Sequence, residues 1–283
     1  MRNPNASAIN ALDAAAQLVP RVAAPWMGVL WLTALPLRLL QVYFIAQLVR
    51  LDAPWKYFHY FLNLAAWLCA AFVLSLYGRA VFVRACRFAR HAPARMSLEP
   101  FKVPLADFLP YLYTALLIEI FFHLSLVLLV VWPLAIVFAG LAAAASQGIG
   151  GPKLLRAPLE VLRLAANWKP LLGTSLIFTL ALVYVYINLY MLIQALLFMA
   201  APLLGDALPR WEFMLAPMWE VFPLLPANGI VTGLLCAGTV LIVEPFWLAA
   251  NVELAQFARA RRTGDDLRLW LARLKAAKFE ASA

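Results

Sequence analysis

A chain of 283 residues that is 65% hydrophobic and only 13% charged is not an ordinary soluble domain, in which about a quarter of the residues are charged. The net charge of +9 could suggest nucleic acid, but the basic residues flank apolar segments, where anionic lipid headgroups and membrane topology explain them. We therefore expect membrane lipids as partners and no nucleic acid. Three cysteines are too few for a disulfide framework, so we expect reduced thiols.

Residues 1–21 are predicted to form a short amphipathic helix at the membrane surface. Four apolar residues recur there at helical spacing: Ile9, Leu12, Ala16 and Val19. Such a stripe would lie on lipid while the opposite face meets water.

Five apolar stretches follow, and the one from Phe108 to Gln147 is about twice the usual length of a membrane span. One helix through all of it would be about 60 Å long, whereas the hydrocarbon core is about 30 Å thick. We expect a tight hairpin turning near residues 130–133, which gives an all-α, polytopic bundle of six spans within residues 24–255. The predicted spans are Ala24–Val49, Tyr57–Tyr77, Phe108–Leu126, Leu129–Gln147, Leu171–Leu197 and Asn228–Ala255.

The distribution of Lys and Arg favours six spans over five. With six, 19 of the 23 basic residues lie on one side, 3 lie on the other and Arg38 is inside the membrane. With five, the two sides hold 9 and 13. Because basic loops stay in the cytoplasm, we expect a multi-pass protein of the bacterial inner membrane with both termini cytoplasmic.

Three cytoplasmic segments resemble juxtamembrane helices. Arginines from Arg79 to Arg90 alternate with apolar residues, as in a helix leaving the membrane, and Leu154–Trp168 places Leu155, Leu159, Leu162 and Ala166 on one face. Residues 265–278 form the third, a C-terminal amphipathic helix that lies on the membrane or docks a soluble partner. On the outer side, residues 202–227 are either a membrane-hugging connector or a docking lid.

Ionisable residues stand at mid-membrane depth in three of the predicted spans. Arg38 lies near the centre of the first span, and Glu119 lies in the third with His123 one turn later on the same face. Glu244 lies near the centre of the sixth span, directly before Pro245. These four ionisable residues are the chemically informative positions of the chain, because a charge at the bilayer centre costs about 2.5–3.5 kcal/mol on insertion scales.

That cost predicts pairing. We expect Arg38 to bond to Glu119, to Glu244 or to both, since its guanidinium fork matches a carboxylate. The pair either fixes helix register or belongs to a polar cavity that binds a headgroup, an ion or a proton. Asn63 and Asn188 line the same cavity or bond one helix to another.

Catalytic signatures are not found in the sequence. The three histidines are in separate segments, no zinc motif is present, and the glycine-rich stretch at residues 148–151 lacks the ending of a phosphate loop. We therefore expect no metal and no cofactor. Gly229 and Gly233 form a GxxxG strip that serves helix packing within the bundle or joins two copies of the chain.

Two stretches resemble a group of bacterial six-span membrane proteins. The first is Ala157–Gly173, an amphipathic lead-in to the fifth span, and the second is Glu244-Pro245-Phe246 followed by the basic exit Arg259–Leu267. They are similar to motifs of the YciC-like proteins and of the membrane domain fused to some glycerophosphodiester phosphodiesterases. The resemblance implies a six-helix bundle of poorly known function and carries no catalytic residues.

Three classes of function remain open from the sequence. The first is a non-enzymatic envelope protein, an accessory or scaffold subunit with a cytoplasmic or membrane protein partner. The second is a translocator of lipid or a small solute that uses buried Arg and Glu. The third is a membrane-embedded enzyme acting on lipid, for which Glu119 and His123 would have to serve as acid and base.

Overall fold

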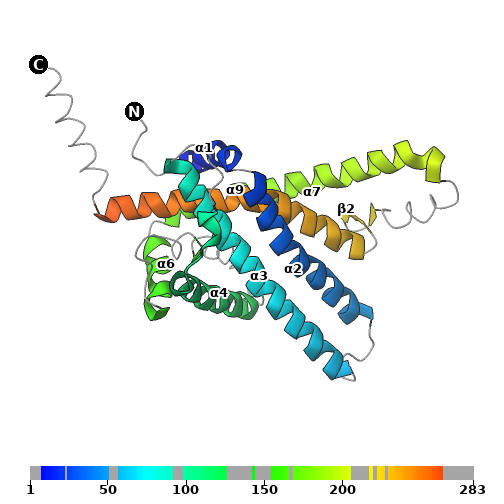
Figure 1. Cartoon of the computed structure of the whole chain (residues 1–283). Helices are drawn as coiled ribbons and strands as arrows, with labels where there is room; N and C mark the ends of the chain where they lie inside the picture. Colours follow the sequence, from blue (N-terminus) through cyan, green and yellow to red (C-terminus); the bar gives the residue numbers. More distant parts are fainter. Residues whose placement is uncertain are drawn as a thin grey trace, which may run out of the picture. The chain divides into compact units, whose positions relative to one another are not determined.

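The computed structural model describes residues 8–22, 24–50, 57–91, 98–125, 142–143, 154–165, 168–204, 217–218, 222–226 and 229–263. The regular structure within these residues is helical except for one short β pairing (Figure 1). The helical elements in chain order are α1 (Ala8–Leu18), α2 (Ala24–Arg50), α3 (Phe58–His91), α4 (Leu105–Ser125), α6 (Ala157–Ala165), α7 (Trp168–Leu204) and α9 (Gly229–Thr263), with 3₁₀ turns η1 (Val19–Arg21), η3 (Glu99–Phe101) and η5 (Leu154–Arg156).

Four of these helices are long and apolar enough to cross a membrane, which identifies a helical membrane protein. The qualifying segments are Ala24–Gln47, Phe58–Ala89, Lys169–Leu196 and Ile230–Arg259, and at most 28% of the most apolar window in each is buried inside the protein. They correspond to the first, second, fifth and sixth predicted spans. Large apolar side chains such as Leu180 and Tyr184 are exposed along them, as expected for surfaces that face lipid.

The predicted third and fourth spans have a different outcome. α4 covers most of the third, although it is not among the four qualifying segments. The fourth predicted span, apart from residues 142–143, and the hairpin turn lie outside the described residues, as does the predicted helix at 265–278. The six-span count therefore stays a prediction.

Three helices are longer than the sequence led us to expect. α3, α7 and α9 have 34, 37 and 35 residues, or about 50–55 Å each, against a hydrocarbon core of about 30 Å. α3 does not end near Tyr77 but continues through Arg79 to His91. Its residues 80–83 have 0% exposure, so this part of α3 packs inside the protein and does not lie on a membrane surface.

The described chain forms two compact units. One contains residues 21–103 and 176–247, and the other contains residues 1–20, 104–175 and 248–283. We refer to the first as the bundle unit, because it holds α2, α3 and most of the apolar length of α7 and α9, and to the second as the α4–α6 unit.

In the bundle unit, α2 and α3 pack side by side along their length (Figure 1). Gly78 of α3 contacts the Thr33 side chain so closely that a β-carbon at this position would collide with it. Near Tyr43 the two helices meet again through a hydrogen bond of 2.8 Å between the hydroxyls of Tyr60 and Tyr43. The turn η3 folds back on the same pair, because the Tyr77 hydroxyl donates to the Phe101 carbonyl at 2.8 Å.

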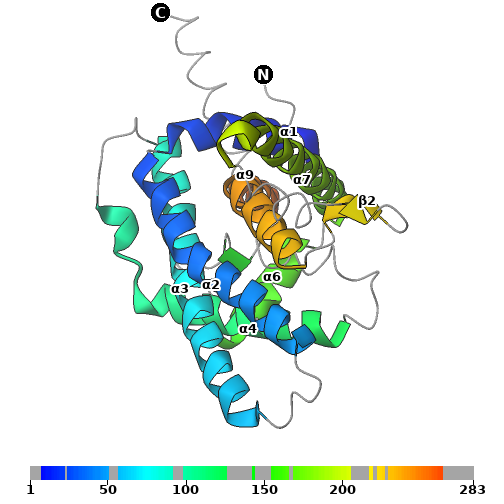
Figure 2. The ribbon, with the colours of Figure 1, turned by 90° about the vertical axis from the view of Figure 1, so that its right-hand side faces the viewer.

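The other half of the bundle unit is built by α7 and α9 (Figure 2). Buried Tyr190 of α7 and buried Leu235 of α9 pack against each other. Small residues permit this approach: Gly238 faces Leu189 of α7. Gly233 lies against Val42 of α2, with 3.0 Å from a β-carbon placed on the glycine to Val42 Cγ1. The predicted glycine strip thus packs against another helix of the same chain at Gly233.

The α4–α6 unit buries mostly small residues. On α1 the buried side chains are Ala11, Ala14, Ala15 and Leu18, whereas Ile9 is 71% exposed. The buried face is thus a different one from the predicted lipid-facing stripe, which stays a prediction. Alanines allow a close helix contact, and Ala8 lies against Gly173 of α7. α4 contacts α6 within the same unit.

The segment between α7 and α9 holds the β pairing. β1 (Pro217–Met218) and β2 (Phe222–Pro226) are antiparallel, with Met218 opposite Phe222 and an irregular register at the proline end. The expectation of an all-α chain holds for the helices and misses this hairpin.

Candidate functional site

A buried ion pair joins α3 to α9 within the bundle unit. Arg79 Nε donates to Glu244 Oε1 at 2.5 Å, and the two side chains are 11% and 1% exposed. The second carboxylate oxygen, Glu244 Oε2, is buried without a hydrogen-bond partner among the described residues. A charge-assisted bond at this length is strong, and both charges need it because lipid and protein surround them.

The pairing corrects one prediction. We expected Glu244 to bond to Arg38, but its partner is Arg79, and Arg38 Nη1 donates instead to Gln41 Oε1 of its own helix at 3.0 Å. The physical reason is that α3 continues without a break past Tyr77 and packs within the protein, which places Arg79 against Glu244 of α9. The Arg38–Glu119 pair stays a prediction.

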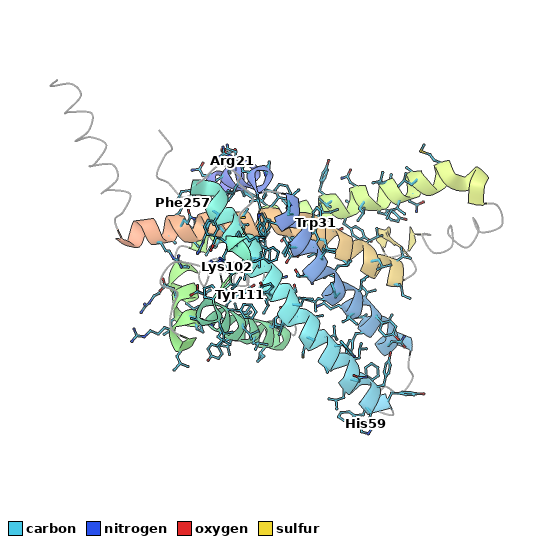
Figure 3. All side chains as sticks on the ribbon, viewed as in Figure 1. Arg21, Trp31, His59, Lys102, Tyr111 and Phe257 are labelled. Carbon is cyan, nitrogen blue, oxygen red and sulfur yellow. The ribbon has the colours of Figure 1, made fainter. Side chains whose placement is uncertain are left out.

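Pro245 creates a second polar contact next to this ion pair. A proline inside a helix has no N–H to donate to the carbonyl four residues earlier, which here is that of Leu241. Trp31 of α2, which is labelled in Figure 3, supplies the missing donor. Its indole Nε1 lies 2.9 Å from the Leu241 oxygen. In lipid an unsatisfied carbonyl is costly, so a side chain from a neighbouring helix supplies the hydrogen bond that α9 lacks at this proline.

Three helices therefore meet at one polar junction, which we define as Trp31, Arg79, Leu241, Glu244 and Pro245. Leu241 and Glu244 are three residues apart and so share a face of α9. α2 contributes an indole donor and α3 a guanidinium donor, while α9 supplies both acceptors. All five residues belong to the bundle unit.

The close contact of α2 and α3 supports this junction. Gly78 is adjacent to Arg79, and its missing side chain lets α2 approach at the level where α3 turns Arg79 toward α9. Thr33 faces Gly78 and bonds back to its own helix, with its hydroxyl 2.8 Å from the Val29 carbonyl. The buried Ser75 hydroxyl lies one turn from Arg79 on the same face of α3.

The other predicted site residues are dispersed. Asn63 is exposed on α3. Asn188 is exposed on α7, where its side-chain amide donates to the Tyr184 carbonyl at 2.7 Å, which is a local bond within one helix. Glu119 is half-buried on α4, and the side chain of His123 lies outside the described part of the chain.

Sequence reasoning missed several functional candidates. Arg79 was placed in a juxtamembrane helix and not among the buried charges. Trp31 was not singled out, although Pro245 leaves the Leu241 carbonyl without its helical donor and so signals that another donor is needed. Asn251 and Glu253 of α9 are also buried, at 1% and 4% exposure, within the α4–α6 unit. The sequence signal that could have identified them is an amide and a carboxylate only two residues apart within an apolar run. Among the described residues, no group of three or more His, Cys, Asp or Glu side chains could hold a metal ion.

Outside the spans, Glu99 of η3 accepts a hydrogen bond from Lys102 at 2.8 Å. This bond, together with the charge of Lys102, lowers the pKa of the Glu99 carboxyl from its ordinary value. Both side chains are at least half exposed, so the pair is screened by water and contributes little to stability.

Comparison with known proteins returned no match to a family model, to a curated protein or to a solved structure.

Proposed function

We propose that the chain is a non-enzymatic accessory or scaffold subunit of a bacterial inner membrane, with six spans and both termini in the cytoplasm. The observation that carries this proposal is the polar junction. Its donors and acceptors are used to join α2, α3 and α9, which is the work expected of buried polar groups that fix helix register.

The distribution of charge supports the proposed orientation. With six spans, 19 of 23 basic residues fall on the cytoplasmic side, and α4 supplies an apolar helix where the third span is expected. Reporter fusions after Gln147 and at Ala283 test this arrangement. Cytoplasmic signals at both positions support six spans, and an external signal at either one refutes them.

A scaffold binds other proteins at a defined stoichiometry, so the decisive measurement is the molar ratio of each bound partner to the chain. The full chain is purified in mild detergent from its own membrane, crosslinked before solubilisation, and its partners are quantified by mass spectrometry. A membrane or envelope protein retained at constant molar ratio through two chromatographic steps supports the proposal. Its absence, together with substrate-dependent flux in proteoliposomes, would refute it.

A translocator is the second candidate, and one observation favours it. The Glu244 Oε2 atom is buried beside a charge and has no hydrogen-bond partner among the described residues, which suits a group that takes up a proton or a polar substrate. Glu244→Gln keeps the size and hydrogen-bonding capacity of the side chain and removes its charge. Flux that is present in the native protein and lost in this variant, measured on reconstituted protein that is still folded, would favour translocation.

A further inference from the structure

α6 has two apolar faces, and only one of them packs against the protein. Ala157, Val161 and Leu164 are 2%, 2% and 4% exposed. At about 100° per residue, these three positions lie on the side of the helix opposite a second apolar set. That set, which begins in η5 and which we call the leucine stripe, is Leu155, Leu159 and Leu162, exposed by 77%, 52% and 56%.

Charged residues sit unevenly around the leucine stripe. Arg156 and Arg163 are exposed and lie about a quarter turn to one side of it. Glu160, the acidic residue of this helix, has only 14% of its side chain exposed, so it is turned toward the protein. Its contact with Arg163 is long, at 3.9 Å, and the arginine remains 68% exposed. The free face of α6 is therefore apolar with a cationic edge.

The position of α6 in the chain places it at the boundary of the membrane. It ends at Ala165, and a helix able to span the membrane begins at Lys169. Four residues cover at most about 14 Å even when fully extended. The segment from Leu154 to Ala165 is about 18 Å long as a helix, too short to cross a hydrocarbon core of about 30 Å.

We propose that α6 lies in the headgroup region of the membrane and binds anionic phospholipid. The leucine stripe inserts among the upper parts of the acyl chains, and Arg156 and Arg163 bind the lipid phosphates from the edge of the stripe. The buried face holds the helix to α4 at the same time. The occupant is lipid because a cationic edge complements an anionic surface and because a span begins within four residues. This site does not depend on whether the protein is a scaffold or a translocator.

The test places an environment-sensitive fluorophore on the leucine stripe. Leu159→Cys is labelled with a nitrobenzoxadiazole group after replacement of the three native cysteines, which are Cys69, Cys86 and Cys236. The labelled protein is reconstituted in two sets of nanodiscs. In one set the quencher-labelled lipid is phosphatidylglycerol and in the other it is phosphatidylcholine, at the same mole fraction, and in both the quencher is high on the acyl chain. Tyr184→Cys, which is exposed within a span of α7, is the matched control.

At position 159 we expect quenching by both lipids. The apparent affinity for phosphatidylglycerol should exceed that for phosphatidylcholine by between about fivefold and about twenty-fivefold, because one or two arginines near an anionic surface contribute that much. At position 184 the two lipids should quench equally. In Arg156→Gln/Arg163→Gln the preference at position 159 should disappear while quenching persists.

Three results would overturn the proposal. The first is a fluorophore at position 159 that is quenched by aqueous iodide and by neither lipid, which would place the leucine stripe in water. The second is protection from both iodide and lipid together with a dimeric mass, which would mean that a second copy of the chain covers the stripe. Equal quenching by the two lipids in the native background would refute the anionic site.

Discussion

The contact between Trp31 and the Leu241 carbonyl allows a quantitative test of the polar junction. Trp31→Phe removes the indole donor and keeps most of the aromatic volume, so Leu241 loses its partner at 2.9 Å. A hydrogen bond between membrane helices contributes about 0.6 kcal/mol on average and up to about 1.7 kcal/mol. Because Pro245 leaves this carbonyl without its normal helical donor, we expect a loss near the upper value, about 1–2 kcal/mol of unfolding free energy.

The same argument predicts that Pro245 controls the size of this loss. In Pro245→Ala the new backbone N–H can donate to the Leu241 carbonyl, so this carbonyl no longer depends on the indole. The cost of Trp31→Phe should then fall by about 1 kcal/mol, which a double-mutant cycle measures as a coupling energy. Trp67→Phe, at an exposed tryptophan of α3, is the matched control and should show no coupling to position 245.

Titration of the protein in mixed micelles with a denaturing detergent unfolds it reversibly and gives the four unfolding free energies of the cycle. If Trp31→Phe costs the same with proline and with alanine at position 245, the indole does not replace the helical donor and the explanation of the junction is wrong. A loss that disappears in the alanine background supports it.

Three further changes test the bundle and its edge. Arg79→Leu should lower the unfolding free energy by about 3–5 kcal/mol because it strands a buried carboxylate, and adding Glu244→Leu should restore part of that loss; a double variant as unstable as the sum of the singles would contradict the pair. Gly78→Ala should cost about 1–3 kcal/mol because its methyl group collides with α2, and an unchanged midpoint of thermal unfolding would argue against the close contact. Lys102→Met should raise the pKa of Glu99, so that this carboxylate takes up its proton at a higher pH as acid is added; carbon NMR of the labelled carboxyl measures it, and an unmoved titration would disprove the bond.

Hydropathy and helix length predicted the location of the long helices well. The first predicted span, Ala24–Val49, coincides with α2 to within one residue. The fifth lies inside α7, and the sixth begins one residue before α9 and ends inside it. These predictions succeed because a run of about 20 apolar residues has few alternatives to a helix in lipid. The charge pattern also marked Glu244 as a residue that needs a partner.

Helix ends were less predictable, for a physical reason. We ended the second span at Tyr77 because Arg79 and later arginines interrupt the apolar run. The structure continues the helix and buries Val81, Phe82 and Val83 completely. A segment with alternating arginine and apolar residues has the same composition whether it leaves the membrane or packs within the protein, so only tertiary contacts separate the two cases.

The choice of partner for Glu244 failed for a related reason. Burial cost predicts that a carboxylate will be paired, but the relative register of two helices decides which base reaches it, and register is a property of their packing. α1 shows the same limit: its buried face, made of three alanines and Leu18, is a second face beside the predicted lipid-facing stripe and was not predicted to pack. Helix contacts in membranes select small side chains, which a hydrophobicity pattern underrates.

The arrangement of polar contacts also constrains how the bundle unit could move. α2 and α3 are held together at two levels, by the packing of Gly78 on Thr33 and by the bond between Tyr60 and Tyr43. A motion that separates these two helices must break both contacts, so they are expected to move as one body. The polar junction joins this pair to α9 through two directional bonds, and Gly233 of α9 also packs against Val42 of α2. If the chain translocates a substrate by moving α9 against this pair, the ion pair of Glu244 must open and the contact of Gly233 with Val42 must repack during the cycle. If the chain is a scaffold, the same bonds stay closed. A crosslink between α2 and α3 would leave either function intact, whereas a crosslink between α3 and α9 would abolish flux and leave partner binding unchanged.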